Sequence, residues 1–254
     1  MRKPFALANW KMAMTLSETV AFIRKFLPLV EGLTDKVEIV ICPPYTALYV
    51  ARQELEGSGI QLGAQNLHPG PGLAWTGEIS AQLLVDAGCR WVMLGHWERR
   101  RHFGEDDEFV NRKVRAAIEA GLCPILLVGE PVNFSGKLEL FLQKQLETLT
   151  RECSADDIAR MVFVYEPEGA IGVEEPASLE RIEEGCAFLR GKLRKDFGEV
   201  AERVRIIYGG SVSPEFASAI LSLPDVDGLG ATRRGRDPEA FAAIVRWIAE
   251  KRAR

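Results

Sequence analysis

Residues 205–231 read RIIYGGSVSPEFASAILSLPDVDGLGA and contain a complete strand, helix and strand. An apolar run that begins at Arg205 has the composition of a buried strand, residues 214–221 have helical periodicity, and a second apolar run begins near Val226. This order predicts two parallel strands joined by a crossover helix, because parallel strands need a long connection.

The same unit recurs along the whole chain. Apolar runs begin near Phe5, Val37, Ile60, Trp91, Pro124, Met161, Arg205 and Val226, and helical periodicity covers residues 17–29, 46–56, 79–87, 108–120, 138–150, 179–197, 214–221 and 238–251. Eight alternations in 254 residues are typical of a closed (β/α)8 barrel, which predicts one α/β domain over residues 1–254. An open doubly wound sheet is disfavoured, because it usually has fewer strands and a glycine-rich turn after the first one.

The composition argues against several classes of function. The chain has 32 Lys and Arg against 36 Asp and Glu, whereas binding of nucleic acid usually needs a dense basic surface. The cysteines are odd in number, form no CxxC pair and have only three histidines beside them, which predicts a reducing compartment and no metal site; they are Cys42, Cys89, Cys123, Cys153 and Cys186. The apolar run over residues 5–8 is too short for a signal sequence or a membrane span, so we expect a cytoplasmic protein with no membrane partner.

Polar side chains that could carry chemistry follow three of the predicted strands, whose ends share one rim of the barrel. Asn9 and Lys11 follow the first strand two residues apart, so both can face the same side. His96 and Glu98 follow the fourth strand. Glu166 ends the sixth strand directly before a proline, which keeps it extended and makes it a fair general base. Taken singly, these residues are better interpreted as a solvated lysine and as a rim histidine in a surface ion-pair network.

Glycine-containing segments follow the last three strands. Residues 168–172 have two glycines around an apolar pair, which suits either a mobile lid or a plain surface loop. Residues 208–211 and 229–232 offer unobstructed backbone N–H groups after strands seven and eight, the usual place for a phosphate group in such a barrel.

Short motifs in a fixed order resemble the triosephosphate isomerase family over nearly the whole chain. They are Asn9-Trp10-Lys11-Met12, Ala64-Gln65-Asn66, Trp75-Thr76-Gly77-Glu78-Ile79-Ser80, Gly95-His96 with Glu98-Arg99-Arg100, Gly129-Glu130, Tyr165-Glu166-Pro167, Ala170-Ile171-Gly172 and Tyr208-Gly209-Gly210-Ser211. Each motif is short, but chance agreement of the ordered set is implausible. The resemblance implies a TIM barrel.

The resemblance also implies interconversion of dihydroxyacetone phosphate and glyceraldehyde 3-phosphate through an enediolate, a step of glycolysis and gluconeogenesis that needs no cofactor. It assigns Glu166 as the base that moves the proton, His96 as the electrophile on the substrate oxygens, Lys11 and Asn9 as contacts of the enediolate, and Glu98 as a supporting residue. The family is itself a standard example of a glutamate base paired with a neutral histidine. We expect His96 to be neutral because it starts a helical turn that carries two arginines.

Substrate binding and assembly are implied in the same way. The phosphate group of a small sugar phosphate is expected against Gly172, Ser211, Leu229 and Gly230. Thr76 resembles the residue that reaches into the neighbouring subunit's site, which implies a homodimer.

The chain departs from the family pattern beside the lid. Trp97 stands where the family has a serine that holds the retracted glutamate, and Glu168 and Gly169 replace an apolar residue and a tryptophan. We expect the Trp97 indole to fill the volume that Gly169 leaves.

The eighth loop departs as well, since it is shorter by about three residues and lacks one of two paired glycines. Arg233, Arg234 and Arg236 follow at once and either supply charge for the phosphate or cap the loop and face water. Two alternative functions stay open: the same proton transfer on a larger ketose phosphate such as a tetrulose phosphate, for which the short loop makes room, and a barrel without turnover that binds a ligand or has a structural role.

Overall fold

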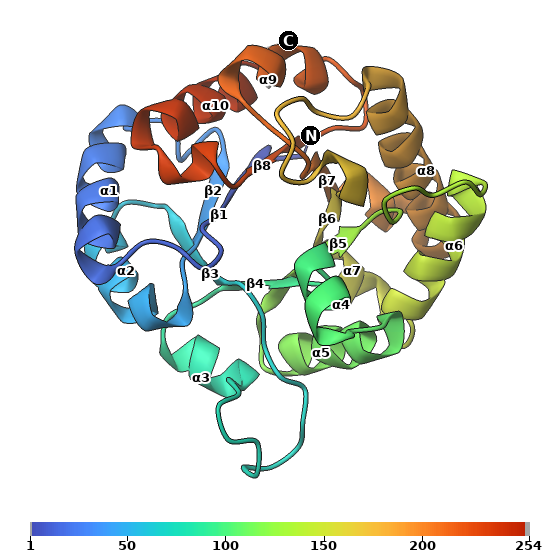
Figure 1. Ribbon diagram of the computed structural model, residues 1–254, viewed down its shortest axis with the longest axis horizontal. Helices are drawn as coiled ribbons and strands as arrows, with labels where there is room; N and C mark the ends of the chain where they lie inside the picture. Colours follow the sequence, from blue (N-terminus) through green and yellow to red (C-terminus); the bar gives the residue numbers. More distant parts are fainter. Residues whose placement is uncertain (1, 252–254) are drawn as a thin grey trace.

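The computed structural model describes residues 2–251 and contains a closed barrel of eight parallel strands (Figure 1). The strands are β1 (Phe5–Asn9), β2 (Glu38–Cys42), β3 (Gln61–Ala64), β4 (Trp91–Leu94), β5 (Cys123–Val128), β6 (Val162–Tyr165), β7 (Arg205–Tyr208) and β8 (Gly228–Ala231). Phe5 on β1 lies opposite both Glu38 on β2 and Gly228 on β8, which closes the barrel. The predicted (β/α)8 barrel is confirmed, and each strand begins within two residues of its predicted start.

Helices form a ring around the barrel (Figure 1). They are α1 (Leu16–Leu29), α2 (Leu48–Leu55), α3 (Ala81–Asp86), α4 (Trp97–Phe103), α5 (Asp107–Glu119), α6 (Leu138–Leu149), α7 (Ala155–Ala159), α8 (Leu179–Phe197), α9 (Pro214–Leu221) and α10 (Pro238–Lys251), with short 3₁₀ turns η1 (Tyr45–Ala47), η2 (Glu168–Ala170), η3 (Gly198–Glu202) and η4 (Arg234–Arg236). The sequence predicted only a helical turn after His96 where α4 lies, and it did not predict α7. The segment predicted over residues 46–56 is divided between η1 and α2.

The core has two layers because successive side chains of a strand point to opposite faces. The inner layer fills the barrel with Phe5, Leu7, Val40, Cys42, Trp91, Met93, Cys123, Ile125, Leu127, Val162, Val164 and Ile207. The rings of Phe5 and Trp91 meet edge to face at 5.1 Å inside it. The outer layer packs the strands against the helices. A filled barrel holds the ends of the strands in fixed positions, so the loops that leave its rim start from a rigid base.

The loop between β3 and α3 extends beyond the ring of helices (Figure 1). Its base is closed by a hydrogen bond of 2.9 Å from the backbone N–H of His68 to the carbonyl of Ile79. The side chains of Leu73 and Trp75 are exposed near its tip. This loop therefore presents apolar surface that the rest of the chain does not cover.

The described residues carry no helix that is long and apolar enough to cross a membrane. Within residues 2–251, no group of three or more His, Cys, Asp or Glu side chains is arranged to hold a metal ion. All five cysteines are free thiols, and four of them are buried.

Candidate active site

Glu166 and His96 lie side by side at the carboxyl ends of β6 and β4. Glu166 follows β6 directly, and its backbone N–H donates a hydrogen bond of 2.8 Å to the carbonyl of Val128 on β5. Gly129 is required here, because a Cβ at that position would lie 2.2 Å from the Glu166 carbonyl oxygen. The Glu166 side chain is 6% exposed, and its Oε1 lies 3.6 Å from Nε2 of His96. The backbone of two strands thus fixes the carboxylate beside the imidazole.

The second oxygen of this carboxylate, Oε2 of Glu166, is buried and has no hydrogen-bond partner among the described residues. Burial raises the pKa of Glu166 to about 8, although the charge of Lys11 opposes that rise. A general base works best when its pKa is close to the working pH, because it must both take up and return the proton. Glu166 has the exposure and the pKa of such a base.

His96 is placed by the start of α4. It is the N-cap of that helix, and its Nδ1 accepts a hydrogen bond of 3.1 Å from the backbone N–H of Glu98. An accepting Nδ1 carries no proton, so the neutral ring has its proton on Nε2, which faces Glu166.

Burial and then the charge of Lys11 lower the pKa of His96 to about 4, while Glu98 opposes them. The neutral state therefore has a different cause from the expected one. Arg99 is paired with Glu105, and Arg100 donates to the Gly95 carbonyl and pairs with Asp107.

Asn9 is the last residue of β1, and its side chain fixes the backbone of Lys11 just after the strand. Oδ1 of Asn9 accepts a hydrogen bond of 2.9 Å from the backbone N–H of Lys11, and Nε2 of Gln65 donates to the carbonyl of Lys11 at 2.9 Å. Nζ of Lys11 donates to Oε1 of Glu98 at 2.6 Å. The predicted supporting residue Glu98 therefore positions the Lys11 ammonium beside the Glu166 and His96 pair.

A cavity of about 470 Å³ opens beside these groups. Its lining includes Lys11, Glu166, lid residues 171–174 and the turn at 209–213. Gly172 and Ser211, both predicted to contact the phosphate, are part of this lining.

Two predicted phosphate contacts, Leu229 and Gly230, are not part of the lining. Strand β8 continues to Ala231, so both residues lie inside the strand and are buried there. Thr232 is the first residue after β8 that reaches the cavity.

The lid is docked against the turn that follows β7. Backbone N–H of Ser211 donates to the Ala170 carbonyl at 2.9 Å, and the Ser211 hydroxyl donates to the Val173 carbonyl. The backbone N–H of Ala177 donates to the Tyr208 hydroxyl at 2.9 Å. These three bonds join both halves of the segment 168–177 to the barrel rim, and its residues 171–174 line the cavity.

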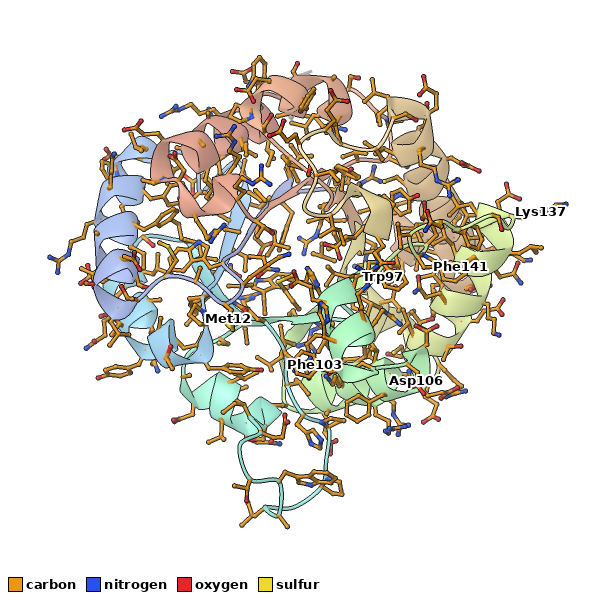
Figure 2. All side chains as sticks on the ribbon, in the orientation of Figure 1. Met12, Trp97, Phe103, Asp106, Lys137 and Phe141 are labelled. Carbon is orange, nitrogen blue, oxygen red and sulfur yellow. The ribbon has the colours of Figure 1, made fainter. Side chains whose placement is uncertain are left out.

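Trp97 braces the base of the lid from α4. Its Nε1 donates a hydrogen bond of 3.0 Å to the carbonyl oxygen of Glu166, and Figure 2 shows its side chain at the end of α4 nearest the barrel opening. The expected packing of Trp97 beside Gly169 is wrong, because no described residue other than the two chain neighbours of Gly169 has an atom within 4 Å of a Cβ built there. The indole hydrogen-bonds the backbone of Glu166 just after β6 and does not fill the volume beside Gly169.

Glu168, the other changed lid residue, is bound on two sides. Its Oε2 accepts a hydrogen bond of 2.7 Å from the backbone N–H of Val132, and its Oε1 pairs with Arg101 of α4. Helix α4 therefore contacts the start of the lid through two side chains, Trp97 and Arg101.

One buried network was not found from the sequence. Nζ of Lys113 on α5 donates to Oε1 of Glu105 at 2.6 Å and to Oδ1 of Asn66 at 2.7 Å. Arg99 donates to the same Glu105 oxygen. A signal was present, since Lys113 falls between Val110 and Val114 on the apolar side of α5, where a lysine needs a buried partner. The network anchors the start of the exposed loop between β3 and α3.

Thr76 lies in that exposed loop. It does not line the cavity of its own chain. The structure thus brings Asn9, Lys11, His96, Glu98 and Glu166 together and places Thr76 apart from them.

A buried carboxylate, a neutral imidazole and an ammonium at the rim of a closed (β/α)8 barrel define an enzyme of the proton-transferring type. The chain matches the family model of triosephosphate isomerase over residues 4–248. It is 45% identical to a triosephosphate isomerase of Symbiobacterium thermophilum, with 100% of both chains covered. It is 40% identical to one of Carboxydothermus hydrogenoformans, with 97% of this chain and 99% of the relative covered, and 41% identical to one of Solibacter usitatus, with 97% and 100% covered. The chain belongs to the triosephosphate isomerase family.

Proposed function

We propose that this chain interconverts dihydroxyacetone phosphate and glyceraldehyde 3-phosphate. The observation that carries the proposal is the buried Glu166 carboxylate, with one oxygen unpartnered and the other 3.6 Å from Nε2 of a neutral His96. The family membership agrees with it.

The chemistry follows from the position of each group. Glu166 takes a proton from the carbon beside the carbonyl group of the substrate, and the electron pair moves onto the carbonyl oxygen. The Nε2–H of His96 and the ammonium of Lys11 stabilise the negative charge on that oxygen, with Asn9 fixing the backbone of Lys11. The Nε2–H of His96 gives its proton to that oxygen, and the imidazole takes up the hydroxyl proton from the oxygen of the adjacent carbon. Glu166 then returns its proton to the carbon that carried the carbonyl group, so the carbonyl and hydroxyl groups exchange places. The closed lid excludes water, which strengthens each of these interactions.

The test is a coupled assay of the purified protein in both directions, together with detection of deuterium at the substrate's exchangeable carbon in heavy water. We expect turnover and deuterium incorporation. A protein that binds inorganic phosphate but incorporates no deuterium would instead support the barrel without turnover.

A larger ketose phosphate is a second candidate substrate, because the cavity of about 470 Å³ could hold it. The same assay with a tetrulose phosphate decides between the two. We expect a higher kcat/KM for the triose phosphates, and the opposite order would favour the larger substrate.

We also propose that the protein works as a homodimer. Leu73 at the tip of the loop between β3 and α3 is fully exposed, Trp75 is half-exposed, and Met12 beside the catalytic Lys11 is almost fully exposed. Large apolar side chains in this state are typical of an uncovered interface. A second copy would bring its Thr76 loop against Met12. Light scattering after gel filtration is expected to give twice the mass of one chain, and Leu73→Asp is expected to shift it to the monomer.

A cytoplasmic location completes the proposal, since five free thiols fit a reducing compartment. Fractionation of the source cells tests it.

A further inference from the structure

Three arginines around the active-site cavity have no partner. Arg233, Arg234 and Arg236 all line the cavity and are exposed, and their guanidinium groups make no hydrogen bond or ion pair within the part of the chain that the structure describes. Most other described arginines are paired, as Arg181 is with Glu130 and Arg190 with Asp227. Three free cations within four residues, all at one cavity, are therefore unusual in this molecule.

The backbone that carries them is rigid. Residues 234–236 form η4, and the carbonyl of its central residue, Gly235, accepts a hydrogen bond of 2.8 Å from the buried indole of Trp10. A Cβ on Gly235 would lie 3.3 Å from the Cβ of Ala8, so this turn is packed closely on β1. The arginine side chains leave a fixed base, and binding of a ligand would order only the side chains themselves.

One set of donors expected for a phosphate group, that of Ser211, is already used at this end of the cavity. The backbone N–H of Ser211 is bonded to the Ala170 carbonyl, and its hydroxyl is bonded to the Val173 carbonyl. Leu229 and Gly230 lie within β8 and do not reach the cavity. Among the described residues, the backbone N–H groups of Gly172, Thr232 and Arg233 line the cavity without an acceptor, and the arginine side chains add positive charge beside them.

The charge of the lining points the same way. Its acidic side chains are Glu166, Glu174 and Glu215, and without the arginines only Lys11 would oppose them. With the three arginines, four cationic side chains face three acidic ones. The arginines thus change the cavity from one that repels a phosphate group to one that attracts it.

Arg234 differs from the other two. Its charge acts on Glu215, where it contributes to a lowered pKa after the larger effects of the Ser213 side chain and the Glu215 backbone N–H.

We propose that Arg233 and Arg236 bind the phosphate group of the substrate, so that this chain recognises a dianionic phosphate by guanidinium side chains in addition to backbone N–H groups. The planar guanidinium group suits this role because it can donate two parallel hydrogen bonds to a phosphate. The inference rests on the proposed function for the identity of the substrate, but phosphate binding itself can be measured without turnover.

The experiment titrates inorganic phosphate by calorimetry into the full-length protein and into Arg233→Gln, Arg236→Gln and the double variant. Arg90→Gln is the matched control, because Arg90 is also exposed and unpartnered but lies just before β4, at the opposite end of the barrel. We expect each single substitution to raise the Kd for phosphate by about 10-fold, the double variant by more, and Arg90→Gln to leave it unchanged. Arg236→Lys is expected to recover part of the loss, since it restores the charge.

Kinetics separate binding from a structural effect. The two substitutions are expected to raise KM for glyceraldehyde 3-phosphate by about 10-fold each with little change in kcat, and to weaken the fall of kcat/KM with added salt. Unchanged phosphate affinity in the double variant would overturn the inference even if the wild-type protein is an active isomerase. Phosphate binding that depends on both arginines in a protein without turnover would support the inference and overturn the proposed function.

Discussion

The two ends of the cavity are built in opposite ways. At the reacting end, Glu166 and His96 are buried, and Lys11 is held by three bonded neighbours. At the other end, the phosphate end, where we propose that the phosphate group binds, Arg233 and Arg236 are exposed on a rigid turn and have no partner among residues 2–251. Proton transfer depends on distances of a few tenths of an ångström, whereas attraction of a dianion depends mainly on charge. The reacting end therefore keeps the family pattern, and the phosphate end departs from it.

The largest effect is expected at the reacting end, from Glu166→Asp. Shortening the side chain withdraws the carboxylate by roughly 1 Å, which is expected to lower kcat by about 10²-fold with little change in KM. Steady-state kinetics in both directions measure this. Glu183→Asp on the exposed face of α8 is the matched control. Unchanged turnover in Glu166→Asp would remove Glu166 from the mechanism and with it the contrast between the two ends.

The pH profile of kcat/KM tests the buried base at the reacting end of the cavity. Glu166 must be ionised to accept a proton, and its pKa is raised to about 8, so activity is expected to rise with pH through this region. Lys11 lowers this pKa and Glu98 raises it. Lys11→Gln is therefore expected to move the midpoint up, and Glu98→Gln to move it down. Shifts in the same direction for both variants would contradict the assignment.

The same raised pKa has a consequence for stability. The folded state binds the Glu166 proton more tightly than the unfolded chain, so its contribution to stability is present below the ordinary pKa of 4.5 and is lost as the pH rises through about 8.

His96 gives a smaller, spectroscopic prediction. Its pKa is lowered to about 4, first by burial and then by Lys11, so nitrogen NMR should show a neutral ring with its proton on Nε2 throughout neutral pH. The unfolded chain takes up this proton near the ordinary pKa of 6.5, so the stability that His96 contributes is present above 6.5 and is lost as the pH falls toward 4. An imidazolium at neutral pH would show that the electrophile is charged.

Most of the fold could be predicted from the sequence because buried strands and amphipathic helices leave periodic patterns. The full length of helix α4 could not, beyond a turn after His96, since its sequence WERRRHF has no apolar stripe and none of its residues is buried. Its start is fixed by the His96 side chain and its end by Gly104 in the left-handed region. Helix α7 spans only Ala155–Ala159, too short for a periodic pattern.

The candidate site, like the fold, could be predicted from the sequence only in part. Sequence motifs were enough to select Glu166, His96 and Lys11, because a family resemblance preserves them in order. The position of Leu229 and Gly230 inside β8 could not be predicted, because the end of this strand depends on its pairing with β1 and β7. The bond from Trp97 to the Glu166 carbonyl could not be predicted, since it joins residues 69 positions apart.

The smallest effect is expected for the coupling between Trp97 and Gly169, where the sequence had suggested a compensating pair. Trp97→Ser removes the hydrogen bond to the Glu166 carbonyl and leaves a cavity, which is expected to cost about 2 kcal/mol of stability and to lower kcat. Gly169→Trp adds an indole where no atom lies within 4 Å of the new Cβ, so it is expected to change stability little.

Because the two sites share no contact, the double variant should behave as the sum of the single variants, with a coupling free energy below about 0.5 kcal/mol. Thermal unfolding and steady-state kinetics of all four proteins complete the cycle, with Trp97→Phe included to keep the ring while removing the donor. Additive effects would mean that Trp97 serves the reacting end alone, by fixing the backbone of the base. A larger favourable coupling would mean that the side chains at positions 97 and 169 pack against each other. The tightly packed reacting end would then include the lid.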